Sequence, residues 1–280
     1  MLKALDHVAL AVEDLDSAVS RYEALLGRAP NWRGADGGAH HAWFQLSNTA
    51  LDVIAPTGPG YTGDRVKARL DEAREGIWAL AFTVDDMAKT RHRLERIGVP
   101  STVARAIRAT HPETGEKRYW TTSVADQKAT HGINIFLIEE ARWPASPFNG
   151  DEAAAITGLD HVVVRTPDPE RAAALYGARF GLDMRLDRSN PEWGTRLMFF
   201  RCGDLVVEVA HSLKDGVSEA PDSFWGLSWR VSDVDAAHAR MTSAGFDVSE
   251  TRTGRKPGTR VFTVRDAPAG VPTLILGKEA

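Results

Sequence analysis

Histidines and carboxylates recur at matching places in the two halves of this 280-residue sequence. The first half holds His7 in the apolar run "LDHVALAV" and Asp52 in "ALDVI"; the second half holds His161 in "LDHVVVRT" and Glu208 in "LVVEVAH". A histidine inside an apolar strand needs a polar partner, because an unpaired polar group is costly to bury. A histidine and a carboxylate facing one cavity could bind a divalent metal, transfer a proton, or only hydrogen-bond to each other.

The segments that hold these residues belong to a pattern that occurs four times along the chain. Each copy reads as a strand, an acidic link, an amphipathic helix and a glycine, followed by further strands. An aspartate precedes each helix, where it would cap the free amides, and the glycine would end the helix in a left-handed conformation. These residues are Asp14, Asp86, Asp168 and Asp233, and Gly27, Gly98, Gly181 and Gly245. The sequence therefore predicts an α+β fold made of four βαβββ units.

A stretch rich in proline, serine, asparagine and glycine separates the second unit from the third. We predict an N-terminal domain over residues 1–140, a linker over 141–156 and a C-terminal domain over 157–280, each domain containing two units. A chain of this length can bury two cores of ordinary size.

Composition excludes several classes of partner. The net charge is −4, with acidic and basic residues interspersed, so no basic surface for nucleic acid is expected. No apolar run approaches the roughly 20 residues that span a bilayer, and a strand pattern begins directly after Met1, which leaves no signal peptide. Cys202 is the single cysteine, which fits a reducing compartment. We expect a cytoplasmic monomer or homodimer that binds a small molecule.

The paired βαβββ units, with their "LDHV…D…G" openings, resemble the vicinal oxygen chelate superfamily, which includes glyoxalase I, extradiol dioxygenases, methylmalonyl-CoA epimerase and bleomycin resistance proteins. The resemblance covers essentially the whole chain. It implies that two units curl into a cup-shaped mixed sheet around a ligand cavity, and that four units form two cups. It identifies the fold more firmly than a reaction, because one fold hosts many activities.

The resemblance also implies a set of metal ligands on the first, fourth, fifth and eighth strands of each cup. His7 and Asp52 in one half, and His161 and Glu208 in the other, match the first two of these positions. The remaining positions carry residues that cannot bind a metal: Ala79, Phe136, Gly226 and Leu274. A conventional site has at least three protein ligands, so each cup has an incomplete set.

Three interpretations of the two histidines stay open. They could be strand residues paired with Asp52 and Glu208, ligands of one divalent metal (Fe, Mn, Zn or Ni) in a site completed by other residues, or metal-free acid–base catalysts. His40 or His41 is the supplement to the first site that we consider, since strand alternation sends one of them inward.

Among these, the second cup is the better candidate for chemistry, with His161 and Glu208 as catalytic residues. Glutamate reaches farther than aspartate, and Arg165 and Arg230 share strand parity with the ligand positions, where they could meet Glu208 or a substrate carboxylate. We expect the first cup, narrowed by Phe136, to be mainly scaffold.

Aromatic residues are predicted to line the cavities, and one inserted segment could cover a cavity mouth. Eight tryptophans occur, many on predicted strands, and Trp120 and Phe136 join Arg165 and Arg230 as predicted substrate-binding residues. Such cups suit a planar or hydrophobic molecule. The insertion 58–76 is predicted to be helical over 64–75, and it either covers a cup mouth or is an exposed connector.

The sequence thus leaves two functions open, and with them the question whether the protein is an enzyme. One is a lyase, isomerase or dioxygenase-like enzyme with a degenerate metal site, acting on a small aromatic or hydrophobic molecule. The other is a metal-free binding or sequestering protein similar to bleomycin resistance proteins.

Overall fold

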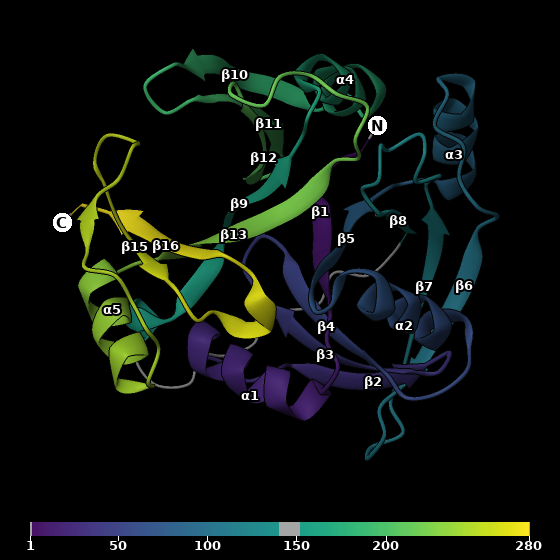
Figure 1. Cartoon of the computed structure of the whole chain (residues 1–280). Helices are drawn as coiled ribbons and strands as arrows, with labels where there is room; N and C mark the ends of the chain where they lie inside the picture. The colour runs from purple at the N-terminus through teal and green to yellow at the C-terminus, as the bar shows by residue number, and fades with distance from the viewer. Residues whose placement is uncertain (1, 140–151, 280) are drawn as a thin grey trace.

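The computed structural model describes residues 2–139 and 152–279, which form two eight-stranded sheets, one from each half of the chain (Figure 1). The strands of the first sheet are β1 (Leu5–Ala11), β2 (Trp32–Asp36), β3 (Ala39–Gln45), β4 (Ala50–Pro56), β5 (Gly76–Thr83), β6 (Arg105–Thr110), β7 (Lys117–Val124) and β8 (Ile135–Glu139). Those of the second are β9 (Ile156–Arg165), β10 (Asp183–Asn190), β11 (Thr195–Cys202), β12 (Leu205–Ser212), β13 (Ser223–Val231), β14 (Arg252–Thr253), β15 (Thr259–Val264) and β16 (Thr273–Lys278).

Both sheets follow the same plan. The first strand of each pair of units, β1 or β9, lies parallel to the fourth strand of its own unit and antiparallel to the first strand of the next unit. The first sheet has the order β1-β4-β3-β2-β6-β7-β8-β5, and the second has the order β10-β11-β12-β9-β13-β16-β15-β14. The predicted α+β fold of four βαβββ units in two mixed sheets is therefore confirmed.

Each unit carries the helix that its sequence predicts. These helices are α1 (Leu15–Leu26), α3 (Met87–Arg96), α4 (Pro169–Ala173) continued by η2 (Ala174–Arg179), and α5 (Val234–Ser243); η1 (Glu152–Ala154) and η3 (Pro268–Gly270) are short turns. The side chains of the four predicted cap aspartates accept backbone hydrogen bonds from the first helical turn. Gly27 ends α1 at a φ of 71°, a conformation that favours glycine.

The two sheets differ in how they close. In the first, β2 pairs with β6 at Ala35 and Thr110, which closes a barrel. In the second, β14 has only two residues, and no pairing between β10 and β14 occurs in the described part of the chain. The first cup is consequently enclosed by strands on all sides, whereas the second stays open along one edge.

The predicted helix of the insertion exists as α2 (Tyr61–Ala73), which packs on the barrel beside β4. It begins against the turn between β2 and β3, where the amides of Thr62 and Gly63 donate to the carbonyl of Gly37 at 3.0 and 2.9 Å. A Cβ on Gly63 would lie 2.2 Å from the carbonyl oxygen of Gly38. Only glycine permits this approach, so the contact fixes the start of α2 over the barrel.

One continuous apolar core joins the two halves. The rings of Phe82 and Phe180, one from each half, lie 6.2 Å apart within it. Arg240 on α5 donates to the carbonyls of Ala24 and Leu25 at the end of α1, the latter at 2.7 Å. A cation at a helix C-terminus is favourable because the last carbonyls lack helical partners.

Most of the predicted linker lies outside the described residues, and the domain boundaries at 140 and 157 remain predictions. No helix in residues 2–139 and 152–279 is both long enough and apolar enough to cross a membrane.

Candidate functional site: two cups with an aspartate–histidine pair in each

In the second cup the structure brings together the predicted catalytic residues. His161 on β9 and Glu208 on β12 come from neighbouring parallel strands and line the same cavity. The Nε2 atom of His161 lies 3.3 Å from Oε2 of Glu208. Both side chains remain partly exposed, at 19% and 15%, so a small molecule in the cup can reach them.

Asp160, which precedes His161 in the chain, orients its ring. The pairing of β9 with β13 shifts register between His161 and Leu159, so Asp160 is the extra residue of a bulge and its side chain can turn back. Its Oδ2 lies 2.9 Å from Nδ1 of His161, and its Oδ1 accepts from Nε of Arg230 at 2.9 Å.

The charge state of Asp160 fixes the tautomer of His161. Burial would raise the pKa of Asp160, but hydrogen bonds from His161 and Arg230 outweigh it and lower that pKa to about 2. A carboxylate only accepts hydrogen bonds, so Nδ1 of His161 carries the hydrogen. In the neutral ring, Nε2 therefore presents its lone pair toward Glu208.

Ser228 is a site residue that the sequence analysis missed. It stands directly opposite His161 in the pairing of β13 with β9, and its Oγ lies 2.7 Å from Nε2 of His161. The only available signal was a serine in the otherwise apolar run "WGLSWRV". In the first cup the corresponding residue opposite His7 is Ala81.

Burial increases the proton affinity of Glu208. Burial raises the pKa of its carboxyl group, and the nearby charges of His161 and Arg255 oppose this rise only in part. The carboxyl group consequently keeps its proton to a higher pH than a free glutamate does.

One of the two arginines takes the predicted place in the second cup and the other does not. Arg230 is absent from the cavity lining; it donates from Nε to Asp160 at 2.9 Å and from Nη1 to Asp204 at 2.8 Å. Arg165 lines the cavity, with its guanidinium carbon 3.1 Å from the ring centroid of Trp225. Neither arginine forms an ion pair with Glu208 in the described residues, so the first of the two expected roles is not found, and a role of Arg165 in binding a substrate carboxylate stays a prediction.

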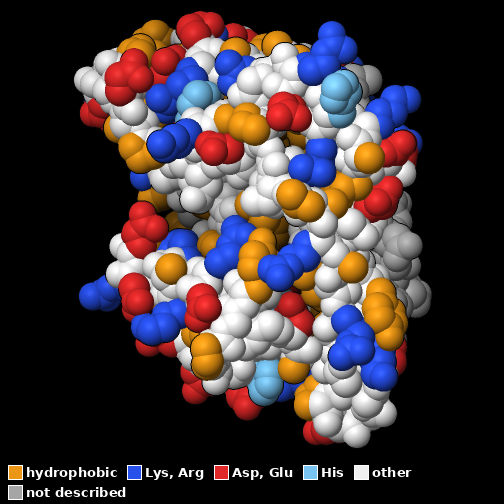
Figure 2. Space-filling model, turned by 90° about the vertical axis from the view of Figure 1, so that its right-hand side faces the viewer, with side chains coloured by type: hydrophobic (Ala, Val, Ile, Leu, Met, Phe, Trp, Pro, Cys, Tyr) orange, Lys and Arg blue, Asp and Glu red, His pale blue; other side chains and the backbone are white. Residues whose placement is uncertain are grey.

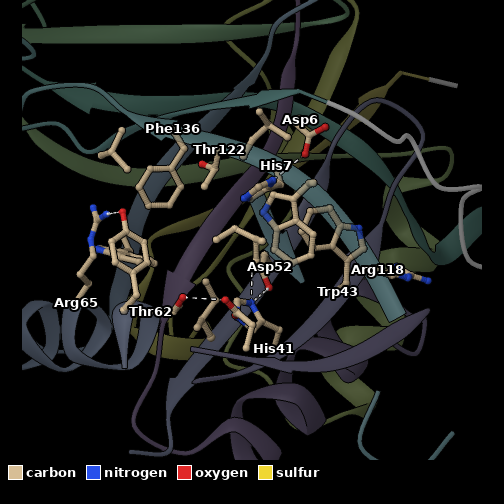
Figure 3. Close-up of a pocket in the computed structure, with 18 of the residues that line it drawn as sticks. Asp6, His7, His41, Trp43, Asp52, Thr62, Arg65, Arg118, Thr122 and Phe136 are labelled. Atoms are coloured by element: carbon tan, nitrogen blue, oxygen red, sulfur yellow. Dashed lines mark hydrogen bonds and ion pairs between the residues drawn. The ribbon is translucent and has the colours of Figure 1, made fainter. Parts of the chain in front are cut away.

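In the first cup, His7 and Asp52 line the same cavity but have different partners (Figure 3). His7 Nδ1 lies 2.8 Å from Oδ1 of Asp6, and its ring meets that of Trp43 edge-on with centroids 4.7 Å apart. Asp52 lies 3.1 Å from Nδ1 of His41 on the adjacent strand. The interpretation that His7 pairs with Asp52 is therefore wrong, because His7 contacts Asp6 instead. Asp52 stands opposite Trp43 in the β3–β4 ladder, and the imidazole that it contacts is that of His41, its diagonal neighbour on β3.

His41 joins a buried chain of polar groups that reaches α2. Its Nε2 lies 2.6 Å from Oδ1 of Asp36, and Oδ2 of Asp36 accepts from the hydroxyl of Thr62 at 3.0 Å. Burial alone would lower the pKa of His41, but the charges and hydrogen bonds of Asp52 and Asp36 raise it to about 10. At neutral pH an imidazolium therefore links two carboxylates beneath the start of α2. Of the two neighbouring histidines, His41 points inward and His40 is exposed, as strand alternation predicts.

Several aromatic side chains line the first cup. They include Trp32, Trp43, Tyr61, Trp78, Trp120 and Phe136. The predicted substrate-binding residues are thus divided: Trp120 and Phe136 belong to the first cup, Arg165 belongs to the second, and Arg230 lines neither. The helix α2 contributes Tyr61, Thr62 and Arg65 to the lining, so it is part of the cavity wall and not a plain connector.

The residues at the remaining metal positions do not fit a metal site. Phe136, Gly226 and Leu274 line the cavities, and Ala79 is buried in the apolar cluster inside the barrel. A Cβ at Gly226 would lie 2.4 Å from the carbonyl oxygen of Pro272, so the local backbone leaves no room for a ligand side chain there. In residues 2–139 and 152–279, no three His, Cys, Asp or Glu side chains are grouped so that they could hold a metal ion.

Comparison with known proteins places the chain in a family. Residues 6–117 and 160–263 match the model of the Glyoxalase/Bleomycin resistance protein/Dioxygenase superfamily. The chain belongs to this superfamily, which confirms the resemblance inferred from its repeats.

Individual relatives differ in name and in the share of the chain that they match. An ethylmalonyl-CoA/methylmalonyl-CoA epimerase of Cereibacter sphaeroides is 30% identical over 119 residues, which cover 41% of this chain and 82% of that protein. A mutant of 4-hydroxymandelate synthase from Streptomyces coelicolor superposes with a TM-score of 0.71 at 14% identity, over 100% of this chain and 94% of that chain. The Mn(II)-bound glyoxalase from Novosphingobium aromaticivorans gives a TM-score of 0.68 at 14% identity, over 100% and 83%. At this identity the structural likenesses concern the fold alone.

Proposed function

We propose that this protein is an enzyme that moves a proton at a carbon atom next to a carbonyl group of a small organic molecule, and that it does so in the second cup. One observation carries the proposal. His161, held by Asp160 through Nδ1, faces Glu208 at 3.3 Å in a cavity open to a small molecule.

The proposed reaction uses these groups in fixed roles. Nε2 of His161 takes the proton from carbon, so the C–H bond breaks, an N–H bond forms, and the electron pair moves to the carbonyl oxygen. Asp160 stabilises the imidazolium that results. In its protonated form the carboxyl group of Glu208 donates a hydrogen bond to the enolate oxygen. A proton from solvent then adds to the opposite face of the planar carbon, which inverts that carbon, and His161 releases the proton that it took to solvent. The hydroxyl of Ser228, which lies 2.7 Å from Nε2, rotates away when the substrate binds.

The name of one relative supports this class of reaction. Epimerisation inverts a carbon centre, and at a carbon beside a thioester carbonyl it is commonly achieved by removing and returning a proton. No step is assigned to a metal, because the donor set of neither cup fits one; a bound Fe, Mn, Zn or Ni ion remains a prediction of the resemblance. A cytoplasmic location and a monomeric or dimeric state also remain predictions.

Proton exchange with solvent tests the proposal. Methylmalonyl-CoA, ethylmalonyl-CoA and a set of small 2-oxo acids are incubated with the protein in D₂O, and loss of the proton next to the carbonyl is followed by NMR. We expect exchange with at least one of them, reduced about 100-fold or more by His161→Gln and by Glu208→Gln, the range typical of a lost general acid or base.

The control is His7→Gln in the first cup, which should keep the wild-type rate. Exchange that depends on His7, or that survives the loss of both His161 and Glu208, would place the chemistry elsewhere. Tight binding of a compound without any exchange would favour the alternative function, a metal-free binding or sequestering protein, for which the aromatic lining of the first cup is the supporting observation.

A further inference from the structure

We propose that the first cup is a separate binding site for a planar aromatic carboxylate, with Arg65 as the residue that holds the carboxylate group. The site lies in the barrel, on different strands from His161 and Glu208, and its ligand is distinct from the substrate of the second cup.

The lining of the barrel favours an aromatic ring. The barrel encloses the cavity on all sides, and indole, phenol and phenyl groups form much of its wall. The rings of Trp78 and Phe136 meet edge-on with centroids 5.3 Å apart, and both line the cavity. Aromatic rings gain from offset or edge-on packing beyond the area they bury.

Arg65 on α2 supplies the charge. Its guanidinium carbon lies 5.4 Å from the ring centroid of Tyr61, 5.8 Å from that of Trp78 and 5.4 Å from that of Phe136. It donates to the hydroxyl of Tyr61 at 2.9 Å and forms no ion pair with a carboxylate in the described part of the chain. A guanidinium has five donors in a planar fork that matches a carboxylate, so most of its hydrogen-bonding capacity is left for a ligand.

The charges around Arg65 favour an anion over a cation. The acidic side chains of the cavity wall are already engaged, Asp36 and Asp52 by His41 and Asp6 by His7. Arg105 adds a second positive charge 4.0 Å from the ring centroid of Tyr61. In Figure 2, Lys and Arg side chains gather with hydrophobic ones near the middle of the molecular face that carries α2 and β6.

The opposite part of the cup offers one polar group for the ring of the ligand. His7 donates from Nδ1 to Asp6, which leaves Nε2 as an acceptor, and no hydrogen bond to Nε2 is found among the described residues. In the view of Figure 3, Phe136 lies between His7 and Arg65. A ring substituent that donates a hydrogen bond, such as a hydroxyl or amino group, would therefore meet His7 while the carboxylate meets Arg65.

Calorimetric titration with 2-naphthoate and its uncharged amide, 2-naphthamide, tests the site. We expect 2-naphthoate to bind to the wild type. Arg65→Gln should lower the affinity for 2-naphthoate at least tenfold, whereas it should change the affinity for 2-naphthamide less than twofold. Phe136→Ala should lower the affinity for both compounds, since it removes part of the wall that contacts the ring of the ligand. Near-ultraviolet circular dichroism verifies that each variant is folded.

The matched control is His161→Ala in the second cup, which should leave both affinities unchanged. Absence of binding at millimolar 2-naphthoate, an unchanged affinity in Arg65→Gln, or loss of binding in His161→Ala would each overturn the proposal. Because 2-naphthoate has no proton on the carbon next to its carboxylate, this result is independent of the proton-exchange activity proposed for the second cup.

Discussion

At the scale of single residues, each cup has an aspartate followed by a histidine, with Nδ1 held by the aspartate and Nε2 turned toward other groups. The difference lies in what surrounds Nε2. His161 has Glu208 and Ser228 within 3.3 Å, whereas no hydrogen bond to Nε2 of His7 is found in the described part of the chain. The second histidine therefore has the polar partners that the proposed proton transfer uses, and the first can accept a hydrogen bond from a ligand.

The buried imidazolium of His41 leads to a prediction about pH. The folded-state pKa of His41 is raised to about 10, above its ordinary value, so its stabilising effect is complete below about pH 6.5 and is lost as pH rises toward 10. We expect the free energy of unfolding from urea titrations to fall over this range in the wild type.

His41→Gln is the matching variant, and it should be about 3 kcal/mol less stable at pH 7, because it leaves two buried carboxylates without their cation. The fall in stability between pH 7 and 10 should be much smaller in this variant. A wild-type stability that stays constant or increases over this range would contradict the assigned charge state.

Residue-level prediction from sequence succeeded where it depended on strand parity alone. His161, Glu208, Trp120 and Phe136 reach the cavities as alternation predicts, and so does His41 in preference to His40. It failed where a bulge or a neighbouring strand decides the partner. Asp160 is the extra residue of the β9 bulge and bonds both His161 and Arg230, and the register of β9 and β13 places Ser228 opposite His161.

At the scale of elements, the contact between α2 and the turn between β2 and β3 positions Arg65 over the first cup. Gly63→Ala would place a Cβ 2.2 Å from the carbonyl oxygen of Gly38, a backbone atom that cannot easily move. We expect this variant to lose about 1–3 kcal/mol of stability, the usual cost of overpacking.

The same substitution should also lower the affinity for 2-naphthoate severalfold in the calorimetric titration, because α2 must shift and carry Arg65 with it. The control is Gly58→Ala, where a Cβ meets nothing within 4 Å, and it should leave both quantities unchanged. Equal effects of the two substitutions would show that α2 does not depend on this contact.

Helices and strands were predictable because caps, periodicity and terminal glycines are local signals. Closure of the first sheet was not predictable, because it depends on one long-range pairing, that of Ala35 with Thr110. Nothing in the sequence of β2 or of β6 indicates that these two strands pair. The open second sheet likewise follows from the shortness of β14 and not from any motif.

At the scale of the whole molecule, the two halves share one core, and polar contacts reinforce the contact between them. Arg240 donates to three carbonyls, those of Ala24, Leu25 and Ala154. We expect Arg240→Met to lower the free energy of unfolding by about 3 kcal/mol, since buried carbonyls lose a charged donor.

Differential scanning calorimetry should give one cooperative transition for the wild type and for Arg240→Met, with a lower midpoint in the variant. Arg265→Met is the control, because Arg265 forms an exposed pair with Asp247 and should contribute less than about 1 kcal/mol. Two separate transitions in the wild type would mean that the halves unfold independently.

Ala81 and Ser228 occupy corresponding positions in the two halves of the chain. If both halves descend from one duplicated ancestor, then the residue opposite the aspartate–histidine pair is one of the positions at which they diverged, and it decides whether a hydroxyl group lies at the imidazole. Each half therefore serves as the reference for the other. Ala81→Ser and Ser228→Ala exchange that difference within one molecule, with no need of an outside homologue.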